Sequence, residues 1–257
     1  HAHYDDDAFN EDRELLLDSM NENGIGYIVN ACASLESLKE TEELTEKYPF
    51  VYGAFGIHPD DAEKMTEDTL QEIRRLVRLP KAVAIGEIGL DYYWHKEEQE
   101  HAVQKKMFLA QMEIAREEKM PFMIHSRDAA KDTLDIVKDC MSGGMYGGII
   151  HCFSYGKEMA REYLNMGLYL GIGGVVTFKN AKKLVETVQT IPMERILLET
   201  DCPYMAPEPH RGTRNDSRNI PYVIAKLAEL KGITPQAVER ITEENAYRLF
   251  AKCPHRA

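Results

Sequence analysis

The chain has 257 residues, of which 44% are hydrophobic and 29% are charged, and its 43 acidic residues outnumber its 31 basic ones to give a formal net charge of −12. This composition is typical of a globular protein, and the acidic balance excludes binding to nucleic acid through a broad basic surface. The sequence contains no run of about 18 apolar residues, so it predicts neither a membrane-spanning helix nor a membrane partner.

Short apolar stretches rich in Val, Ile and Gly alternate with longer, charged stretches that have the period of an amphipathic helix. Seven strands are predicted, over residues 26–32, 51–58, 82–88, 121–126, 147–153, 168–176 and 196–201. Helices are predicted near residues 8–22, 34–47, 66–78, 97–119, 128–140, 155–165, 179–189, 218–231 and 234–251. Near-continuous apolar strands separated by helices indicate a parallel sheet covered by helices.

Strands and helices that alternate over about 250 residues predict a (β/α)8 TIM barrel, with residues 1–257 as a single domain. Seven strands are one short of a closed barrel. His1-Ala2-His3, which an acidic loop follows, looks like the end of a strand. We therefore expect the first strand to be truncated before residue 1. The Pro-rich stretch 202–221 is predicted to be a long loop over the barrel mouth rather than a linker.

Histidines and acids gather at the ends of the predicted strands. Five of the nine histidines lie at a carboxyl end: His1, His3, His58, His125 and His151. Three acids interrupt an apolar strand run: Glu87, Glu199 and Asp201. The carboxyl ends of barrel strands share one rim, so we expect these side chains to converge at the C-terminal mouth, where barrel enzymes carry their function.

These residue types suit divalent metal ions. His1 and His3 share a strand face by alternation, and a buried carboxylate such as Glu87 must be protonated, paired or metal-bound. A carboxylate can also bridge two ions. The predicted metal ligands are His1, His3, Glu87, His125, His151 and Asp201. Zn, Mn, Fe or Ni would fit this mixture, and Mg is possible.

Asp201, two further acids and several cations are predicted to take part in proton transfer, ligand support or substrate binding. Asp201 is also predicted to accept the proton of the attacking water, and Glu199 to support a ligating histidine from behind. Arg127 shares the inward face of His125 and offers a fork for phosphate or carboxylate. Asp91 could hold a ligand histidine or bind substrate. The other predicted substrate contacts at the rim are His58, Arg211 and Arg214, although a surface ion pair is an equal alternative for the last two.

Several segments, in order along the whole chain, closely resemble the TatD-like metal-dependent hydrolases: H-A-H, G-I-H-P, G-E-I-G-L-D-Y, I-H-S-R-D-A, I-H-C-F-S, G-G-V-V-T-F-K, L-L-E-T-D-C-P-Y and P-H-R-G-x-R-N. The resemblance implies a TIM barrel of the metallo-dependent hydrolase superfamily, two divalent metal ions and DNase activity. It places the metal ligands at the same six residues, with Glu87 bridging both ions.

The favoured function is therefore a two-metal deoxyribonuclease that cleaves phosphodiester bonds from a strand end. The partner would be DNA or a small phosphodiester. One alternative is a hydrolase of a small phosphodiester, amide or ester, including D-aminoacyl-tRNA deacylation, and another is a non-catalytic metal-binding scaffold. Five cysteines, an odd number without a C-x-x-C pair, indicate reduced thiols and a cytoplasmic location. The oligomeric state is not encoded in these motifs, and a monomer is favoured.

Overall fold

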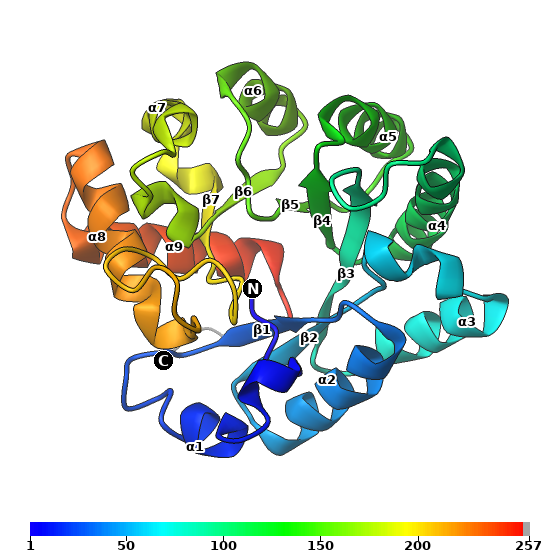
Figure 1. The fold of residues 1–257 in the computed structure, drawn as a ribbon, viewed down its shortest axis with the longest axis horizontal. Helices are drawn as coiled ribbons and strands as arrows, with labels where there is room; N and C mark the ends of the chain where they lie inside the picture. The colour runs from blue at the N-terminus through cyan, green and yellow to red at the C-terminus, as the bar shows by residue number, and fades with distance from the viewer. Residues whose placement is uncertain (254–257) are drawn as a thin grey trace.

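The structure is a computed structural model that describes residues 1–253. Within this range, seven parallel strands form one sheet in sequential order, which curls into a barrel (Figure 1). The predicted barrel class is confirmed. The strands are β1 (Ile28–Ala31), β2 (Val51–Phe55), β3 (Ala82–Asp91), β4 (Phe122–Arg127), β5 (Gly148–Ile150), β6 (Tyr169–Ile172) and β7 (Ile196–Leu198).

Helices α2 to α8 surround the strands, and α9 crosses behind them in the view of Figure 1. No helix of residues 1–253 is both long and apolar enough to cross a bilayer. The helices are α1 (Arg13–Asp18), α2 (Leu35–Lys47), α3 (Glu67–Leu76), α4 (Glu98–Glu117), α5 (Ala130–Ser142), α6 (Lys157–Asn165), α7 (Lys182–Thr190), α8 (Ile220–Lys231) and α9 (Pro235–Leu249).

The opening between β1 and β7 is closed at the mouth by the first three residues. Ala2 forms parallel bridges with Asn30 of β1 and with Cys202, which follows β7. Residues 1–3 therefore sit where the end of an eighth strand would lie. Below them is a largely apolar cavity of about 550 Å³, lined in part by Val29, Leu197 and Phe250. The truncation of the first strand before residue 1 stays a prediction.

Strand side chains alternate between the inside of the barrel and the layer beneath the helices. In β4, Met123 belongs to the inner apolar cluster, while Phe122 and Ile124 pack in the outer one. Because alternation continues along the strand, His125 points inward above Met123. The same reasoning places His151 above Ile149, which is also in the inner cluster. The alternation of strand side chains thus places His125 and His151 at the centre of the mouth.

The main boundary differences have local causes. The helix expected over 8–22 is only Arg13–Asp18, because polar, turn-forming residues follow it up to Gly24, whose φ is 81°. Strand β3 extends beyond the predicted residue 88 to Asp91. Its pairing with β4 requires Gly89, since a Cβ there would lie 2.0 Å from the carbonyl oxygen of His125.

Candidate metal centre

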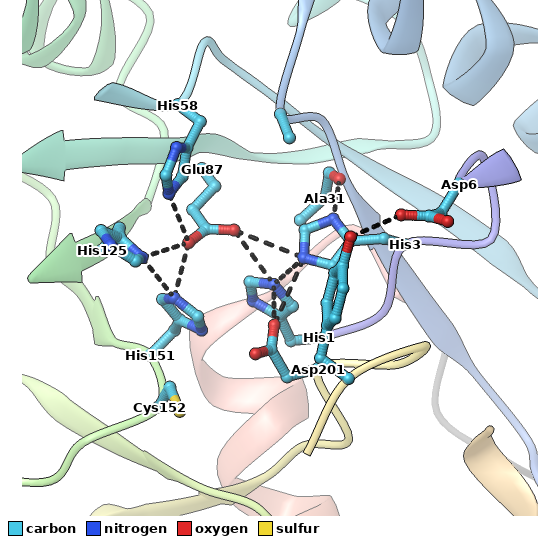
Figure 2. A network of polar contacts seen from close by, with 12 residues as sticks. His1, His3, Asp6, Ala31, His58, Glu87, His125, His151, Cys152 and Asp201 are labelled. Carbon is cyan, nitrogen blue, oxygen red and sulfur yellow. Dashed lines mark hydrogen bonds and ion pairs between the residues drawn. The ribbon is translucent and has the colours of Figure 1, made fainter. Parts of the chain in front are cut away.

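Glu87 lies between two groups of imidazoles (Figure 2). Its Oε2 is 3.3 Å from Nε2 of His1 and 3.5 Å from Nε2 of His3. Its Oε1 is 2.6 Å from Nε2 of His151 and 2.9 Å from Nδ1 of His125. The two oxygens of one carboxylate therefore face two separate sets of nitrogen atoms.

Asp201 completes the set around His1 and His3. Its Oδ1 is 3.3 Å from Nε2 of His3 and 3.5 Å from Nε2 of His1, and these two nitrogens are 3.0 Å apart. Ligands of an ion bound at about 2.0–2.2 Å lie roughly 3–3.5 Å from one another. The spacing and the donor types of all six predicted ligands therefore fit a divalent ion on each side of Glu87.

Burial and charge act in opposite directions on these groups. Burial raises the pKa of Glu87, but the charge of His151 and the hydrogen bonds from His125 and His151 outweigh it and hold that pKa well below its usual value. Burial lowers the pKa of His3, but the hydrogen bond to Asp201 and the nearby carboxylates raise it to about 10. The site thus attracts positive charge, and a divalent ion would replace these protons.

Hydrogen bonds to the remaining ring nitrogens orient two of the histidines. Nδ1 of His3 donates to the carbonyl of Ala31 at 2.8 Å, and Nε2 of His125 lies 3.1 Å from Oδ2 of Asp91. Such contacts fix the tautomer and the ring orientation of a ligand. Asp91 is fully buried and contacts His125, which favours the first of its two predicted roles, holding a ligand histidine, over a substrate contact.

Glu199 was predicted to support a ligating histidine, and it contacts the backbone beside His151. Its Oε1 accepts a hydrogen bond from the backbone N–H of Cys152, the residue after His151, and burial raises the pKa of this carboxyl to about 7. Space for the carboxyl exists because residue 171 is glycine, where a Cβ would lie 2.2 Å from Oε2. Glu199 therefore supports His151 through the backbone.

His58 lies closer to the ligands than a rim contact would. Its Nε2 is 3.9 Å from Oε1 of Glu87, and its ring centroid is 4.3 Å from that of His125. Its Nδ1 accepts a hydrogen bond from the backbone N–H of Asp60. His58 therefore borders the His125 side of the centre and faces the space above it.

The three predicted arginines have different surroundings. Arg214 forms hydrogen bonds of 2.7 and 2.6 Å with both carboxylate oxygens of Asp12, which is the surface ion pair named as its alternative. This contact favours the ion-pair alternative over a substrate contact for Arg214. The guanidinium of Arg211 lies 4.2 Å from the ring centroid of Phe178. The guanidinium of Arg127 lies over aromatic rings in the loop after β3.

Sequence reasoning missed those rings. Tyr93 and Trp94 are 41% and 64% exposed and lie in the loop after Asp91, the last residue of β3. Three consecutive aromatic residues begin at Tyr92, immediately after an inward acid. This run of aromatic residues fits neither strand nor helix periodicity, and that departure could have indicated an exposed aromatic loop.

The geometry agrees with comparison to known proteins. The family model described as TatD-related DNase matches residues 1–251. The chain belongs to the TatD family. A TatD relative from Bacillus subtilis, named as the uncharacterized metal-dependent hydrolase YabD, is 42% identical over 97% of both chains.

Two other TatD proteins extend the comparison. One from Citrobacter rodentium, named 3'-5' ssDNA/RNA exonuclease TatD, is 34% identical over 88% of this chain and 87% of its own. The crystal structure of the TatD homolog YjjV from Escherichia coli superposes with a TM-score of 0.90 at 28% identity, covering 99% of this chain and 97% of that one. The family and the barrel fold therefore rest on nearly the whole chain.

Proposed function

We propose that this TatD-family metal-dependent hydrolase uses two divalent ions to cleave phosphodiester bonds at the end of a DNA strand. The observation that carries the proposal is the position of Glu87, whose two carboxylate oxygens face two ligand groups at the barrel mouth. We further propose that the chain acts as one barrel domain in the cytoplasm, where its cysteines would stay reduced.

The chain's own residues supply the positioning and the proton transfer. Ions held on the two sides of Glu87 would polarise the phosphodiester and acidify the attacking water. Burial raises the pKa of Asp201, but the hydrogen bond from His3 and the charge of His151 lower it overall, so its carboxylate is ready to accept the proton of that water. Arg127 and His58 flank the centre and would hold the non-bridging oxygens.

The charge of the protein supports attack at a strand end. A net charge of −12 disfavours wrapping a duplex around the surface, so the polymer would be gripped locally at the mouth. The relative from Citrobacter rodentium is named as a 3'-5' exonuclease. Carried over to this chain, that direction predicts removal of nucleotides from a free 3′ end.

The test uses oligonucleotides blocked at the 3′ end, blocked at the 5′ end, or closed into circles, each incubated with Mg²⁺ or Mn²⁺. We expect the 3′ block and the circle to resist and the 5′-blocked strand to be shortened stepwise. Equal cleavage of all three substrates would contradict end-directed attack. A parallel panel of small phosphodiesters, esters, amides and D-aminoacyl-tRNA separates the alternative hydrolases, and inactivity on every substrate would favour the scaffold alternative.

A further inference from the structure

An exposed cluster of rings and cations lies beside the metal centre. We call it the β3 platform, and it consists of Tyr93, Trp94, Lys96 and Arg127. The rings of Tyr93 and Trp94 meet edge to face, with centroids 4.7 Å apart. The guanidinium of Arg127 is 4.0 Å from the centroid of Tyr93 and 5.5 Å from that of Trp94, and Nζ of Lys96 is 5.3 Å from Tyr93.

The platform is rigidly attached to the metal centre through Asp91. One oxygen of Asp91 accepts the backbone N–H groups of Tyr93 and Trp94 at 2.9 and 3.1 Å, while the other binds His125. Arg127 stands two residues beyond His125 on β4, a rise of about 7 Å along the strand. A molecule bound to the platform would therefore lie directly beside the bond that the centre attacks.

The cations of the platform are available for an anionic ligand. Among residues 1–253, neither Lys96 nor Arg127 forms an ion pair, although acids are in excess in this chain. Arg214, at another part of the mouth, is paired with Asp12. The acidic residues Glu97 and Glu98 follow the platform at the start of α4.

We propose that the β3 platform binds an unpaired nucleobase next to the phosphodiester being cut. Trp94 stacks on the base, and Arg127 and Lys96 pair with the flanking phosphates. Aromatic side chains among cations are the usual means of holding single strands, because every base presents a flat face. In a duplex that face is covered by neighbouring base pairs. The platform thus selects single-stranded ends, an inference that rests on the proposed nuclease function.

The protein provides its own probe, because Trp94 is its one tryptophan. The full chain is titrated in EDTA, where no cleavage occurs, with a single-stranded oligonucleotide, a blunt duplex of the same sequence, and an abasic strand with the same number of phosphates. We expect saturable quenching of Trp94 emission by the base-containing single strand and little change with the other two. Equal quenching by all three would overturn base stacking.

Kinetics with metal test whether stacking serves the reaction. Trp94→Ala should raise KM for a single-stranded oligonucleotide by about 5- to 100-fold, the range for losing one stacked base, with a smaller change in kcat. Trp94→Phe should restore most of the affinity. Tyr146→Ala is the matched control, because Tyr146 is 57% exposed but precedes β5 at the opposite end of the barrel. It should behave as wild type.

The two proposals fail in different ways. If wild-type protein cleaves oligonucleotides but Trp94→Ala keeps the same KM, the platform is refuted and the nuclease function stands. If the protein cleaves no nucleic acid yet is quenched selectively by single strands, the nuclease function is refuted and base binding stands. The rise in melting temperature when Mn²⁺ replaces EDTA does not depend on a nucleobase and should be the same in Trp94→Ala as in wild type, and its loss would indicate damage to the metal centre instead.

Discussion

The metal centre and the β3 platform are neighbours at the barrel mouth, but their side chains are held differently. Glu87 is 2% exposed and faces imidazoles on both sides, whereas Trp94 is 64% exposed and is fixed mainly through its backbone. We therefore expect a substitution of Glu87 to change the contacts of the imidazoles on both sides of it. We expect a substitution of Trp94 to leave the surrounding structure in place. The comparison predicts that the proposed chemistry and the proposed choice of substrate can be varied separately in this molecule.

The largest effect is expected from Glu87→Ala. Both ligand groups lose the carboxylate between them, so the turnover rate should fall on the order of 10³-fold, the upper range for removing one electrostatic group. Bound metal, measured by elemental analysis after gel filtration, should fall in parallel. Glu87→Gln preserves the shape without the charge and should be nearly as inactive. Full activity of either variant would remove Glu87 from the centre.

Metal binding should stabilise the fold through the centre and not through the platform. At a free metal concentration 100 times Kd, binding to the folded state alone contributes about 2.7 kcal/mol. The melting temperature of wild-type protein and of Trp94→Ala should therefore rise by the same several degrees when Mn²⁺ or Zn²⁺ replaces EDTA. The rise should be absent in Glu87→Ala. A smaller rise in Trp94→Ala would show that the two regions are coupled.

Asp91 is where the two regions meet, and two substitutions can separate its roles. Asp91→Asn keeps an oxygen for the N–H groups of Tyr93 and Trp94 but loses the charge beside His125. We expect metal affinity to fall about 10- to 100-fold, as for other residues that orient a ligand. Quenching of Trp94 by single strands should persist. Asp91→Ala should weaken both metal binding and the quenching of Trp94 by single strands. Intact quenching in Asp91→Ala would show that the platform does not depend on Asp91.

The smallest effect is expected from Arg214→Ala. Its ion pair with Asp12 is partly exposed, and such pairs contribute less than about 1 kcal/mol to stability. KM for oligonucleotides should change less than twofold, whereas Arg127→Ala should raise it as much as Trp94→Ala does. A comparable increase in KM in Arg214→Ala and Arg127→Ala would support Arg214 as a substrate contact.

The sequence predicted most of the fold and the clustering of the six candidate ligands, because both depend on local periodicity. Alternation turns His125 and His151 inward, and barrel topology brings the strand ends together whatever their separation in the chain. The contact partners of Glu199 and Arg214 could not be predicted in this way. Their partners, Cys152 and Asp12, lie 47 and 202 residues away, and no period relates them.

The exposure of Tyr93 and Trp94 was also not predicted, because no sequence period relates the contacts that produce it. Their exposure depends on how Asp91 folds the loop after β3 back over Arg127, through hydrogen bonds between residues whose side chains do not follow a strand or helix pattern. Asp91 itself illustrates the point. Its position at a strand end was visible in the sequence, but its complete burial was not.

Because residues 1–3 close the barrel, assembly of the centre depends on how far synthesis of the chain has proceeded. His3 contacts Asp201, 198 positions further along the chain, so one side of the centre cannot form before residue 201 has been synthesised. Contacts of such long range form late in folding. Glu87, His125 and His151 can assemble earlier, from adjacent strands. A nascent chain that has not reached Asp201 could therefore assemble only the side of the centre with Glu87, His125 and His151. We expect the full set of six candidate ligands to form only after residue 201 has been synthesised.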